Sequence, residues 1–441
     1  MLCSLRWALA LVVLTTSFAS AQPPVPPPVP PLAPPPNTSP LPPALPVKTP
    51  DPVATAPNPP MPTPLGTMDA PKPNTPPSKI NERGLAEWLA DFRSSDPTVR
   101  ERAVKVIPLF GVEAARKQAI KPLTGLLDDP DPGVRVNAIL IIATIGFDKL
   151  EDLKTTSDKL ASVLGKTLPG SVIRVHATRA LGSFGREAFG AINAVVAVAD
   201  DPSWEVRAAV ATTLGRIGGI AFEDKAIQTT ASPNLIPIVK RPPSKAAMDK
   251  LNFHLIRDPS ATVRMEACHS LVLLGPPYAA DPNNYPAVAK PYIDVISARV
   301  KNFEKDASVK VWLMLLYIMY DDRVFDATLK SIGGLVSATD PQLQVQALNA
   351  LAVLGAKSKP MMNAILTALF HDEPMVAAAA ITTVMSMGDE ARAALPELER
   401  LVLTTKNADL KKFAENAVAS LKNDRRPAAP IAPAALPAKK P

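Results

Sequence analysis

The sequence predicts an all-α fold, an α-solenoid, from three observations. A short pattern that begins near an Asp-Pro pair and ends at a glycine occurs eight times along the chain. The copies follow one another at nearly regular intervals, and a second apolar segment with helical spacing lies between them. Helical hairpins that repeat with such a period stack into a solenoid, in which each unit packs mainly on its neighbours.

One copy, DPSWEVRAAVATTLGRIGG from Asp201 to Gly219, shows what the pattern encodes. Asp201 and Pro202 predict a helix start, because Asp can accept the free amide protons of a first turn and Pro is tolerated at the first helical position. From Val206 the apolar or small side chains recur at offsets of three and four residues, which places them on one helical face. The glycines at the end predict a helix stop. The alanines between leave room for a neighbouring helix.

The eight copies align on one position near the start of the pattern. This position holds Arg100, Arg135, Arg174, Arg207, Arg264, Lys310, Gln344 and Ala377, with spacings of 35, 39, 33, 57, 46, 34 and 33 residues. The two long spacings mark insertions. Second helices are predicted near Glu113, Lys159, Ala191 and Ala391, so the solenoid consists of about eight hairpins.

The consensus of these copies, DPxVRxxAxxALGxxG, resembles HEAT repeats of the phycobilisome-lyase type, over roughly Lys79 to Asn423. The resemblance implies a right-handed superhelix. It also implies a polar ladder of Asp and Arg side chains between adjacent loops. The ladder residues would be Asp96, Arg100, Asp131, Arg135, Arg174, Asp201, Arg207, Asp258 and Arg264. Gln344 and Ala377 depart from the pattern, so the ladder is expected to fail toward the C-terminus.

The solenoid is predicted to occupy residues 79–424, with an amphipathic helix closing each end. The N-terminal cap begins at Lys79 and would bury Leu85, Trp88, Leu89 and Phe92. The C-terminal cap begins at Ala408. A solenoid needs such caps because its terminal units otherwise expose an apolar face.

Residues 1–21 have the pattern of a secretory signal peptide. Arg6 precedes a short apolar run, and Ala19-Ser20-Ala21 precedes the expected mature start. The apolar run is too short to cross a bilayer as a helix, so no membrane span is expected. The sequence thus predicts an exported protein that is periplasmic, on the cell surface or secreted; the alternative is a cytosolic chain with an apolar first helix.

Two flanking segments lack the composition of a folded core. Residues 22–78 contain 25 prolines in 57 positions, which predicts a disordered, extended spacer. Residues 425–441 are rich in Pro and Ala with basic ends, which predicts a disordered tail; its alternative role is weak attachment to an anionic polymer or membrane surface. Removal of the signal leaves Cys268 as the single cysteine, which excludes an intrachain disulfide and favours a buried core position.

The two insertions are predicted to form a binding edge. The first carries Lys240 and Arg241 in a basic, proline-bearing stretch, and the second carries Tyr278, Tyr285 and Tyr292 among prolines. Tyrosine is common in recognition surfaces. The alternative is that these rings pack on neighbouring repeats and cover an irregular joint.

The sequence offers little sign of chemistry or of nucleic-acid binding. The four histidines are isolated, and none is followed by Glu, whereas deoxyhypusine hydroxylase, a HEAT-like enzyme, holds iron with repeated His-Glu pairs. We find no nucleophile elbow, phosphate loop or zinc-type cysteine spacing. Acidic runs such as Asp128-Asp129 lie where helices start, so capping explains them without a metal. The net charge of +7 comes from local excesses rather than a continuous basic stripe, which argues against a nucleic-acid partner.

These observations predict an exported, non-enzymatic scaffold that binds a protein or peptide partner and needs no cofactor. Two alternatives stay open. The first is a cell-envelope structural protein that binds an anionic polymer. The second is an enzyme, such as a HEAT-like lyase, with a site assembled from several repeats; converging polar residues with perturbed ionisation would favour it.

Overall fold

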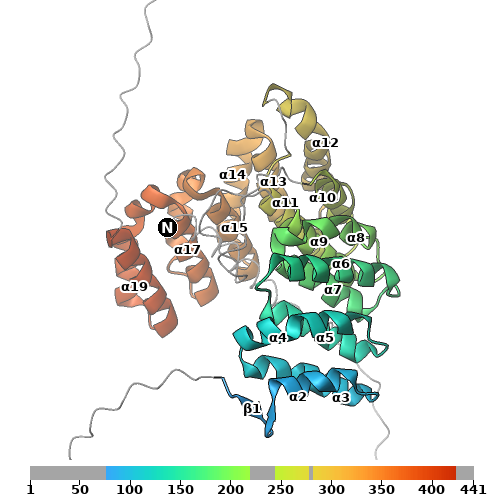
Figure 1. The fold of residues 1–441 in the computed structure, drawn as a ribbon. Helices are drawn as coiled ribbons and strands as arrows, with labels where there is room; N and C mark the ends of the chain where they lie inside the picture. Colours follow the sequence, from blue (N-terminus) through green and yellow to red (C-terminus); the bar gives the residue numbers. More distant parts are fainter. Residues whose placement is uncertain (1–75, 219–243, 278–281, 424–441) are drawn as a thin grey trace, which may run out of the picture.

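The computed structural model describes residues 76–218, 244–277 and 282–423, which form two stacked layers of helices (Figure 1). The predicted signal peptide and the predicted basic tail lie outside the described residues, as do all but the last three residues of the predicted spacer. The α-solenoid expected from the sequence is confirmed within the described part of the chain.

Eight hairpins follow one another, and in each a helix of one layer precedes a helix of the other. The first layer, here the inner layer, contains α3 (Pro97–Val106), α5 (Pro132–Ile145), α7 (Val172–Ser183), α9 (Trp204–Ile217), α11 (Ala261–Leu274), α13 (Ala307–Tyr320), α15 (Pro341–Leu354) and α17 (Pro374–Ser386). The outer layer contains α4 (Val112–Gly125), α6 (Leu150–Lys166), α8 (Ile192–Ala197), α10 (Lys245–Asp249), α12 (Tyr285–Ala298), α14 (Phe325–Gly334), α16 (Met362–Ala368) and α18 (Leu395–Thr404). Two π-helical turns, Lys250–His254 and Arg299–Phe303, extend α10 and α12.

Small residues let the inner helices lie close together. A Cβ atom added to Gly182 of α7 would lie 2.7 Å from Thr213 Oγ1 of α9, and one added to Gly215 of α9 would lie 2.8 Å from Ser270 Cα of α11. Hydroxyl groups at these contacts satisfy the neighbouring backbone: Thr213 donates to the Thr178 carbonyl at 2.9 Å, and Ser270 donates to the Ala211 carbonyl at 2.8 Å. Ala208, Ala209 and Ala211 of α9, for which the sequence predicted the same role, are buried.

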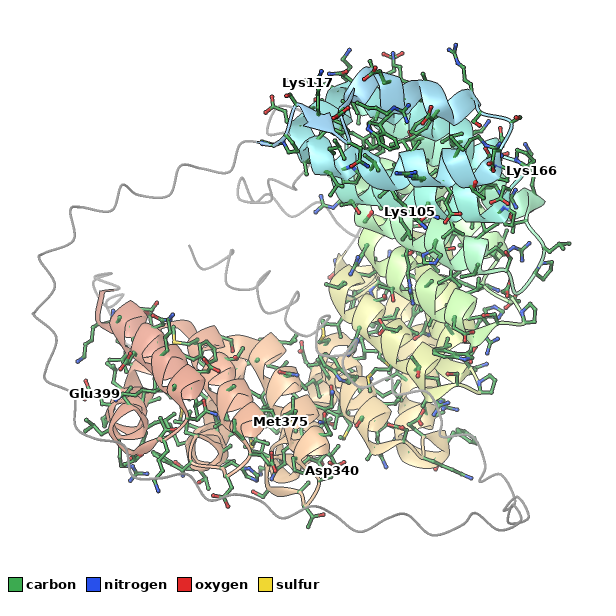
Figure 2. The ribbon with its side chains drawn as sticks, turned by 90° about the horizontal axis from the view of Figure 1, so that it is seen from below. Lys105, Lys117, Lys166, Asp340, Met375 and Glu399 are labelled. Carbon is green, nitrogen blue, oxygen red and sulfur yellow. The ribbon has the colours of Figure 1, made fainter. Side chains whose placement is uncertain are left out.

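The outer helices touch their neighbours in the same layer much less than the inner helices do. A double layer packed more tightly on one side curves toward that side, so the inner helices line the concave side. The N-terminal and C-terminal arms are set at an angle to one another, as Figure 2 shows, with Lys105 and Lys117 on one arm and Met375 and Glu399 on the other.

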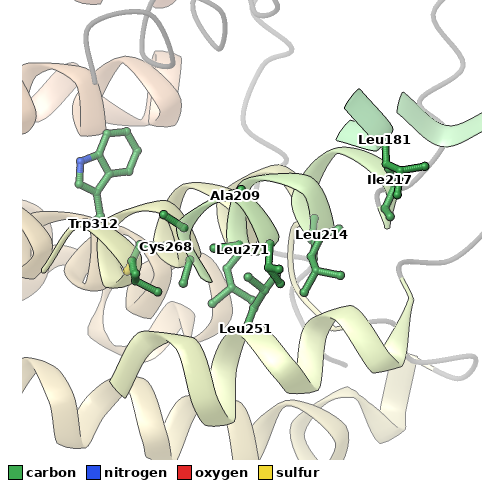
Figure 3. Packing of buried hydrophobic residues seen from close by; sticks show 14 of the residues in the cluster. Leu181, Ala209, Leu214, Ile217, Leu251, Cys268, Leu271 and Trp312 are labelled. Carbon is green, nitrogen blue, oxygen red and sulfur yellow. The ribbon is translucent and has the colours of Figure 1, made fainter. Parts of the chain in front are cut away.

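The core lies between the two layers and is continuous along the stack. Leu181, Leu214, Ile217 and Leu271 point from the inner layer toward it, and Leu251 meets them from the outer layer (Figure 3). Each fully buried aliphatic side chain of this kind stabilises the fold by about 1.5–3 kcal/mol. Cys268 is completely buried, as predicted, and burial raises the pKa of its thiol well above the ordinary value.

Closing glycines end most inner helices for a conformational reason. Gly111, Gly146, Gly185, Gly275, Gly355 and Gly388 adopt φ values of 90°, 67°, 63°, 75°, 58° and 64°. A Cβ atom makes this left-handed region costly, so the chain turns toward the outer helix where glycine stands.

The caps agree with the sequence in part. The C-terminal cap is α19 (Ala408–Asn423), as predicted. At the N-terminal end the predicted helix is wrong over its first residues, because β1 (Lys79–Ile80) and β2 (Arg83–Gly84) form a small antiparallel hairpin before α2 (Leu85–Ala90). Asn81 and Glu82 take positive φ at the turn, which a helix does not permit. Leu85, Trp88 and Phe92 are nevertheless buried, and Leu89 is half-buried.

A polar ladder joins adjacent loops. Three ladder arginines, Arg100, Arg207 and Arg264, donate from Nε to a carboxylate in the next loop and from Nη1 to carbonyl groups of their own loop, as Arg100 does to Asp129 at 2.7 Å and to the Ser94 carbonyl at 2.8 Å. Arg174 instead donates from Nη1 to Asp201, and its buried Nε has no partner among the described residues. Arg207 pairs in the same way with Asp258, and Arg264 with Glu304. Burial alone would raise the pKa of Asp129, but the hydrogen bonds from Arg100 and from the Asp131 N–H, together with the charges of Arg100 and Arg135, hold that pKa below its usual value.

The carboxylate of each pair lies two residues before the helix cap, and this corrects part of the predicted ladder. Asp96 and Asp131 cap α3 and α5 and are not ladder partners. Asp201 does pair with Arg174 at 2.7 Å, but Ser203 is the cap of α9, so the helix begins at Trp204. The cap residue's own N–H bonds to the ladder carboxylate, as in Ser203 to Asp201 and Ser260 to Asp258.

The ladder has one gap and one end. Arg135 donates only to the carbonyl groups of Asp129 and Pro130, and no carboxylate of the described residues pairs with it. Beyond Glu304 the ladder stops: Gln344 donates to the Ala338 carbonyl of its own loop, and Ala377 has no polar side chain. The expected failure toward the C-terminus is confirmed.

The ladder and the helix cap can be tested separately, because Asp129 pairs with Arg100 and Asp131 caps α5. Asp129→Ala leaves the buried Arg100 guanidinium without its partner, and we expect it to lower the free energy of unfolding by about 3–5 kcal/mol. Asp131→Ala removes only a helix cap, which costs about 1 kcal/mol. Urea unfolding followed by circular dichroism measures both. Equal losses would show that the carboxylate of Asp129 is no more than a second cap.

Candidate functional site

The inner face is the surface of the inner helices that points away from the outer layer. It is formed by the second, fifth and ninth residues after each ladder position, a spacing that keeps side chains on one side of a helix. In Figure 3 the ring of Trp312, which is the second residue after the ladder position Lys310 of α13, projects away from Leu251 of the outer layer. This face lies on the concave side of the stack.

Polar side chains gather at the centre of the inner face. We call this set the central polar cluster: His176 and Arg179 of α7, Thr212 and Arg216 of α9, and Glu266 and His269 of α11. One hydrogen bond joins two of the helices, from Thr212 Oγ1 to Glu266 Oε2 at 2.9 Å. Three successive repeats thus contribute two residues each.

Glu266 is half-buried, and its surroundings oppose its charge. Burial raises the pKa of the Glu266 carboxyl above its ordinary value. The hydrogen bond from Thr212 and the positive charges of Arg216 and Arg179 act in the opposite direction without reversing that shift. Glu266 therefore holds its proton more readily than an exposed glutamate.

Arg216 is a cation without a direct counter-ion among the described residues. Burial lowers the pKa of its guanidinium, and the charge of Glu266 offsets this only in part. No carboxylate of the described segments lies within ion-pair distance of it. Arg186, just after α7, has its pKa lowered by burial in the same way. Burial without a partner disfavours such charges unless a ligand supplies one.

His269 has no hydrogen-bond partner for either ring nitrogen, although only 5% of the residue is exposed. Its ring packs edge to face against Trp312, with the centroids 4.3 Å apart. Trp312 donates from Nε1 to Gln346 Oε1 of α15 at 2.7 Å. Burial lowers the pKa of His269 from 6.5 to about 4, so the imidazole is neutral at neutral pH.

The flanks of the central polar cluster differ in chemistry. On the N-terminal side, α5 presents Leu140, which is 40% exposed, with the half-buried Val136 and Ile141. On the C-terminal side, Trp312 of α13 and Asn349 of α15 are buried, at 1% and 5% exposure, and Gln346 of α15 is half-buried. The inner face therefore runs from an apolar stretch through charged groups to the half-buried amide of Gln346.

The structure places the predicted binding edge differently for each residue. Tyr292 is only 6% exposed; it stacks on Phe253 with centroids 5.2 Å apart and donates its hydroxyl to Asp249 Oδ1 at 2.6 Å. Tyr285 is half-buried and donates to the Tyr320 carbonyl at 3.1 Å. These two rings follow the packing alternative.

Three other predicted binding residues, Tyr278, Lys240 and Arg241, lie outside the described residues. Binding through the edge stays a prediction that depends on them and on the accessible part of Tyr285. Gly218 and Ser244, the described residues on either side of the first insertion, are joined by a hydrogen bond from the Ser244 N–H to the Gly218 carbonyl at 3.0 Å.

Sequence reasoning missed the central polar cluster because its members come from three repeats. One signal was available: charged and histidine side chains stand where neighbouring copies have Ala or Leu, as at Glu266 against Ala209 and at Arg179 against Leu140. Aligning the copies on the ladder position brings them into register.

The cluster can donate and accept hydrogen bonds and can pair with an anion. Within the described segments, no group of three or more His, Cys, Asp or Glu side chains could hold a metal ion. In the same part of the chain, no helix is both long enough and apolar enough to cross a bilayer.

A family model of HEAT repeats matches residues 83–172 and 157–247, in agreement with the fold. An engineered protein of known structure is 18% identical with a TM-score of 0.40, over 76% of this chain and 88% of its own. The Escherichia coli protein YibA is 15% identical with a TM-score of 0.37, over 71% of this chain and 95% of its own. No curated protein matches the chain.

The buried, unpartnered imidazole of His269 makes stability depend on pH. In the unfolded chain it binds a proton below about pH 6.5, whereas in the folded protein it does so only near pH 4, so acidification through this window favours unfolding. The difference corresponds to about 3 kcal/mol at pH 4. His269→Phe removes the titrating group and two unsatisfied nitrogens. We expect the loss of unfolding free energy between pH 7 and pH 4, measured by urea unfolding, to be about 3 kcal/mol smaller in His269→Phe than in the wild type. Equal losses in the two proteins would contradict a neutral buried imidazole.

Proposed function

We propose, from the premise that residues 83–247 are HEAT repeats, that this protein is an exported scaffold that binds a protein or peptide partner along its inner face. The fold is typical of protein-interaction scaffolds, since a solenoid presents an extended concave surface. The observation that carries the proposal is the central polar cluster, whose charged groups gather on this surface from three repeats.

Buried polar groups in folded proteins are nearly always paired. His269 departs from this rule, and it shares the inner face with the half-buried Arg216, which pairs with no carboxylate of the described residues; each would gain hydrogen bonds from a bound partner. A purely structural inner face gains nothing from such groups, because apolar side chains of similar volume stabilise a stack better than unpaired charges do.

The edge formed by the insertions is kept as a secondary contact region. Tyr285 is its described member, whereas Tyr278, Lys240 and Arg241 belong to the predicted edge but lie outside the described residues. Export of the protein to a periplasm, the cell surface or the medium rests on the pattern of residues 1–21 alone.

An enzyme is the alternative that the perturbed ionisation of the central polar cluster would favour. We propose binding in preference because burial accounts for the shifts at Glu266, Arg216 and His176. Ion-pair networks with a purely structural role also shift pKa values, so the shifts in this cluster do not require a catalytic reaction. An envelope protein that holds an anionic polymer is the other alternative; its binding would fall steeply with salt.

Two leucines with the same exposure test where the partner binds. Leu140 lies on the inner face and Leu150 at the start of α6 in the outer layer, and each is 40% exposed. We expect Leu140→Glu to weaken retention of a partner from envelope and secreted fractions by about tenfold, because a charge replaces an apolar contact. Leu150→Glu should leave retention unchanged.

Quantitative mass spectrometry of the proteins retained by the full chain measures this effect. The opposite result, in which Leu150→Glu loses the partner and Leu140→Glu retains it, would place the contact on the outer layer. Loss by Tyr285→Ala alone would move the site to the edge.

A further inference from the structure

We propose that the centre of the inner face binds an extended acidic peptide segment, with an Asp or Glu side chain of that segment paired to Arg216. This inference rests on the proposed function and specifies the chemistry of the partner. Its starting point is a guanidinium that is half-buried, points into the concave side and pairs with no carboxylate of the described residues.

The guanidinium is the right group for this role. It presents a rigid fork of N–H donors that matches a carboxylate in two parallel hydrogen bonds. The ladder shows this geometry in the same protein, where Arg207 holds Asp258 at 2.6 Å and 3.0 Å. Arg216 is available for an external partner because its neighbour Glu266 accepts from Thr212 and does not approach within ion-pair distance.

The surrounding charges favour an incoming anion. The positive charges of Arg179 and Arg216 act on Glu266 from two helices. The pKa of that carboxyl is raised, so it takes up a proton more readily than an exposed glutamate. A peptide carboxylate that approaches Arg216 is therefore repelled less by Glu266 than it would be by an ionised glutamate.

The flanks favour a chain over a compact anion such as phosphate. The apolar stretch at Leu140 and the half-buried amide of Gln346, whose oxygen accepts from the buried Trp312, lie on either side of the central polar cluster. Neighbouring packed helices are about 10 Å apart, so α5 and α13 are separated by about 40 Å. An extended peptide covers that span with about twelve residues. Its apolar side chains and backbone groups would use the flanks while one acidic side chain reaches Arg216.

The test measures binding of a fluorescein-labelled dodecapeptide of alternating Glu and Ala to the full chain by fluorescence anisotropy. The same peptide with Gln in place of Glu is the ligand control. Arg216→Gln removes the proposed partner. Arg102→Gln removes the same charge from an exposed site on the inner-face side of α3 and is the matched protein control.

We expect the wild type to bind the Glu peptide at least about tenfold more tightly than the Gln peptide, and Arg216→Gln to lose at least about tenfold, as for a charged hydrogen-bonded pair. Arg102→Gln should change the affinity by less than about twofold. The melting temperature of Arg216→Gln should stay the same or rise, because the substitution removes a charge whose burial is unfavourable. A variant that melts lower would instead mark Arg216 as structural and contradict the proposal.

Two results overturn the inference in different ways. Equal weakening by Arg216→Gln and Arg102→Gln, with polyphosphate competing as well as the peptide, would show general attraction of polyanions. Failure of the wild type to bind the Glu peptide, while Leu140→Glu still abolishes partner retention, would refute an acidic partner and leave the scaffold function standing. Failure of both measurements would refute both.

Discussion

Where Gly182 meets Thr213 and Gly215 meets Ser270, the inner helices approach so closely that a single added methyl group would collide with the neighbouring helix. The hydroxyl groups at these contacts turn the close approach into hydrogen bonds to the next backbone. The outer helices have larger separations, so the stack must bend. The concave side, and with it the gathering of side chains from successive repeats on one face, follows from this difference in spacing.

The ladder fixes the other dimension, the register between successive loops. Arg207, like Arg100 and Arg264, ties the carbonyl groups of its own loop to a carboxylate in the next, and that carboxylate in turn accepts from the N–H of the next cap residue. Helix start, loop and neighbour are thus joined in one network. It ends after Glu304, in the C-terminal arm, where close helix packing continues without it, as between α15 and α17.

The architecture was accessible from the sequence because a period of about 33–57 residues, a capping Asp or Ser and a closing glycine each have a local physical meaning. The ladder partners were less accessible. In DDPDP the cap Asp131 and the partner Asp129 are indistinguishable by type, and Glu304 is followed by Lys305 where other copies have Pro. The N-terminal hairpin depends on positive φ at Asn81 and Glu82, which residue pattern alone did not indicate.

The candidate site was the least predictable part. Tyrosines near prolines suggested an exposed edge, yet Tyr292 finds both a ring and a carboxylate inside the stack. The central polar cluster draws on α7, α9 and α11, and the first insertion separates α9 from α11 in sequence, so only the packing of these two helices brings Arg216 near Glu266. Its charges are visible in the sequence, but their burial is not.

The most direct test of the account is a distance measurement between the two arms. Spin labels on Lys117→Cys and Glu399→Cys, with Cys3→Ser, report that distance by pulsed electron resonance, since Cys268 is buried and will not react. Gly215→Val forces α9 and α11 apart, whereas Gly165→Val makes the same change on α6, where an added Cβ meets nothing. The account predicts a longer distance for Gly215→Val and the wild-type distance for Gly165→Val. A wild-type distance in both would contradict the claim that close inner packing sets the curvature.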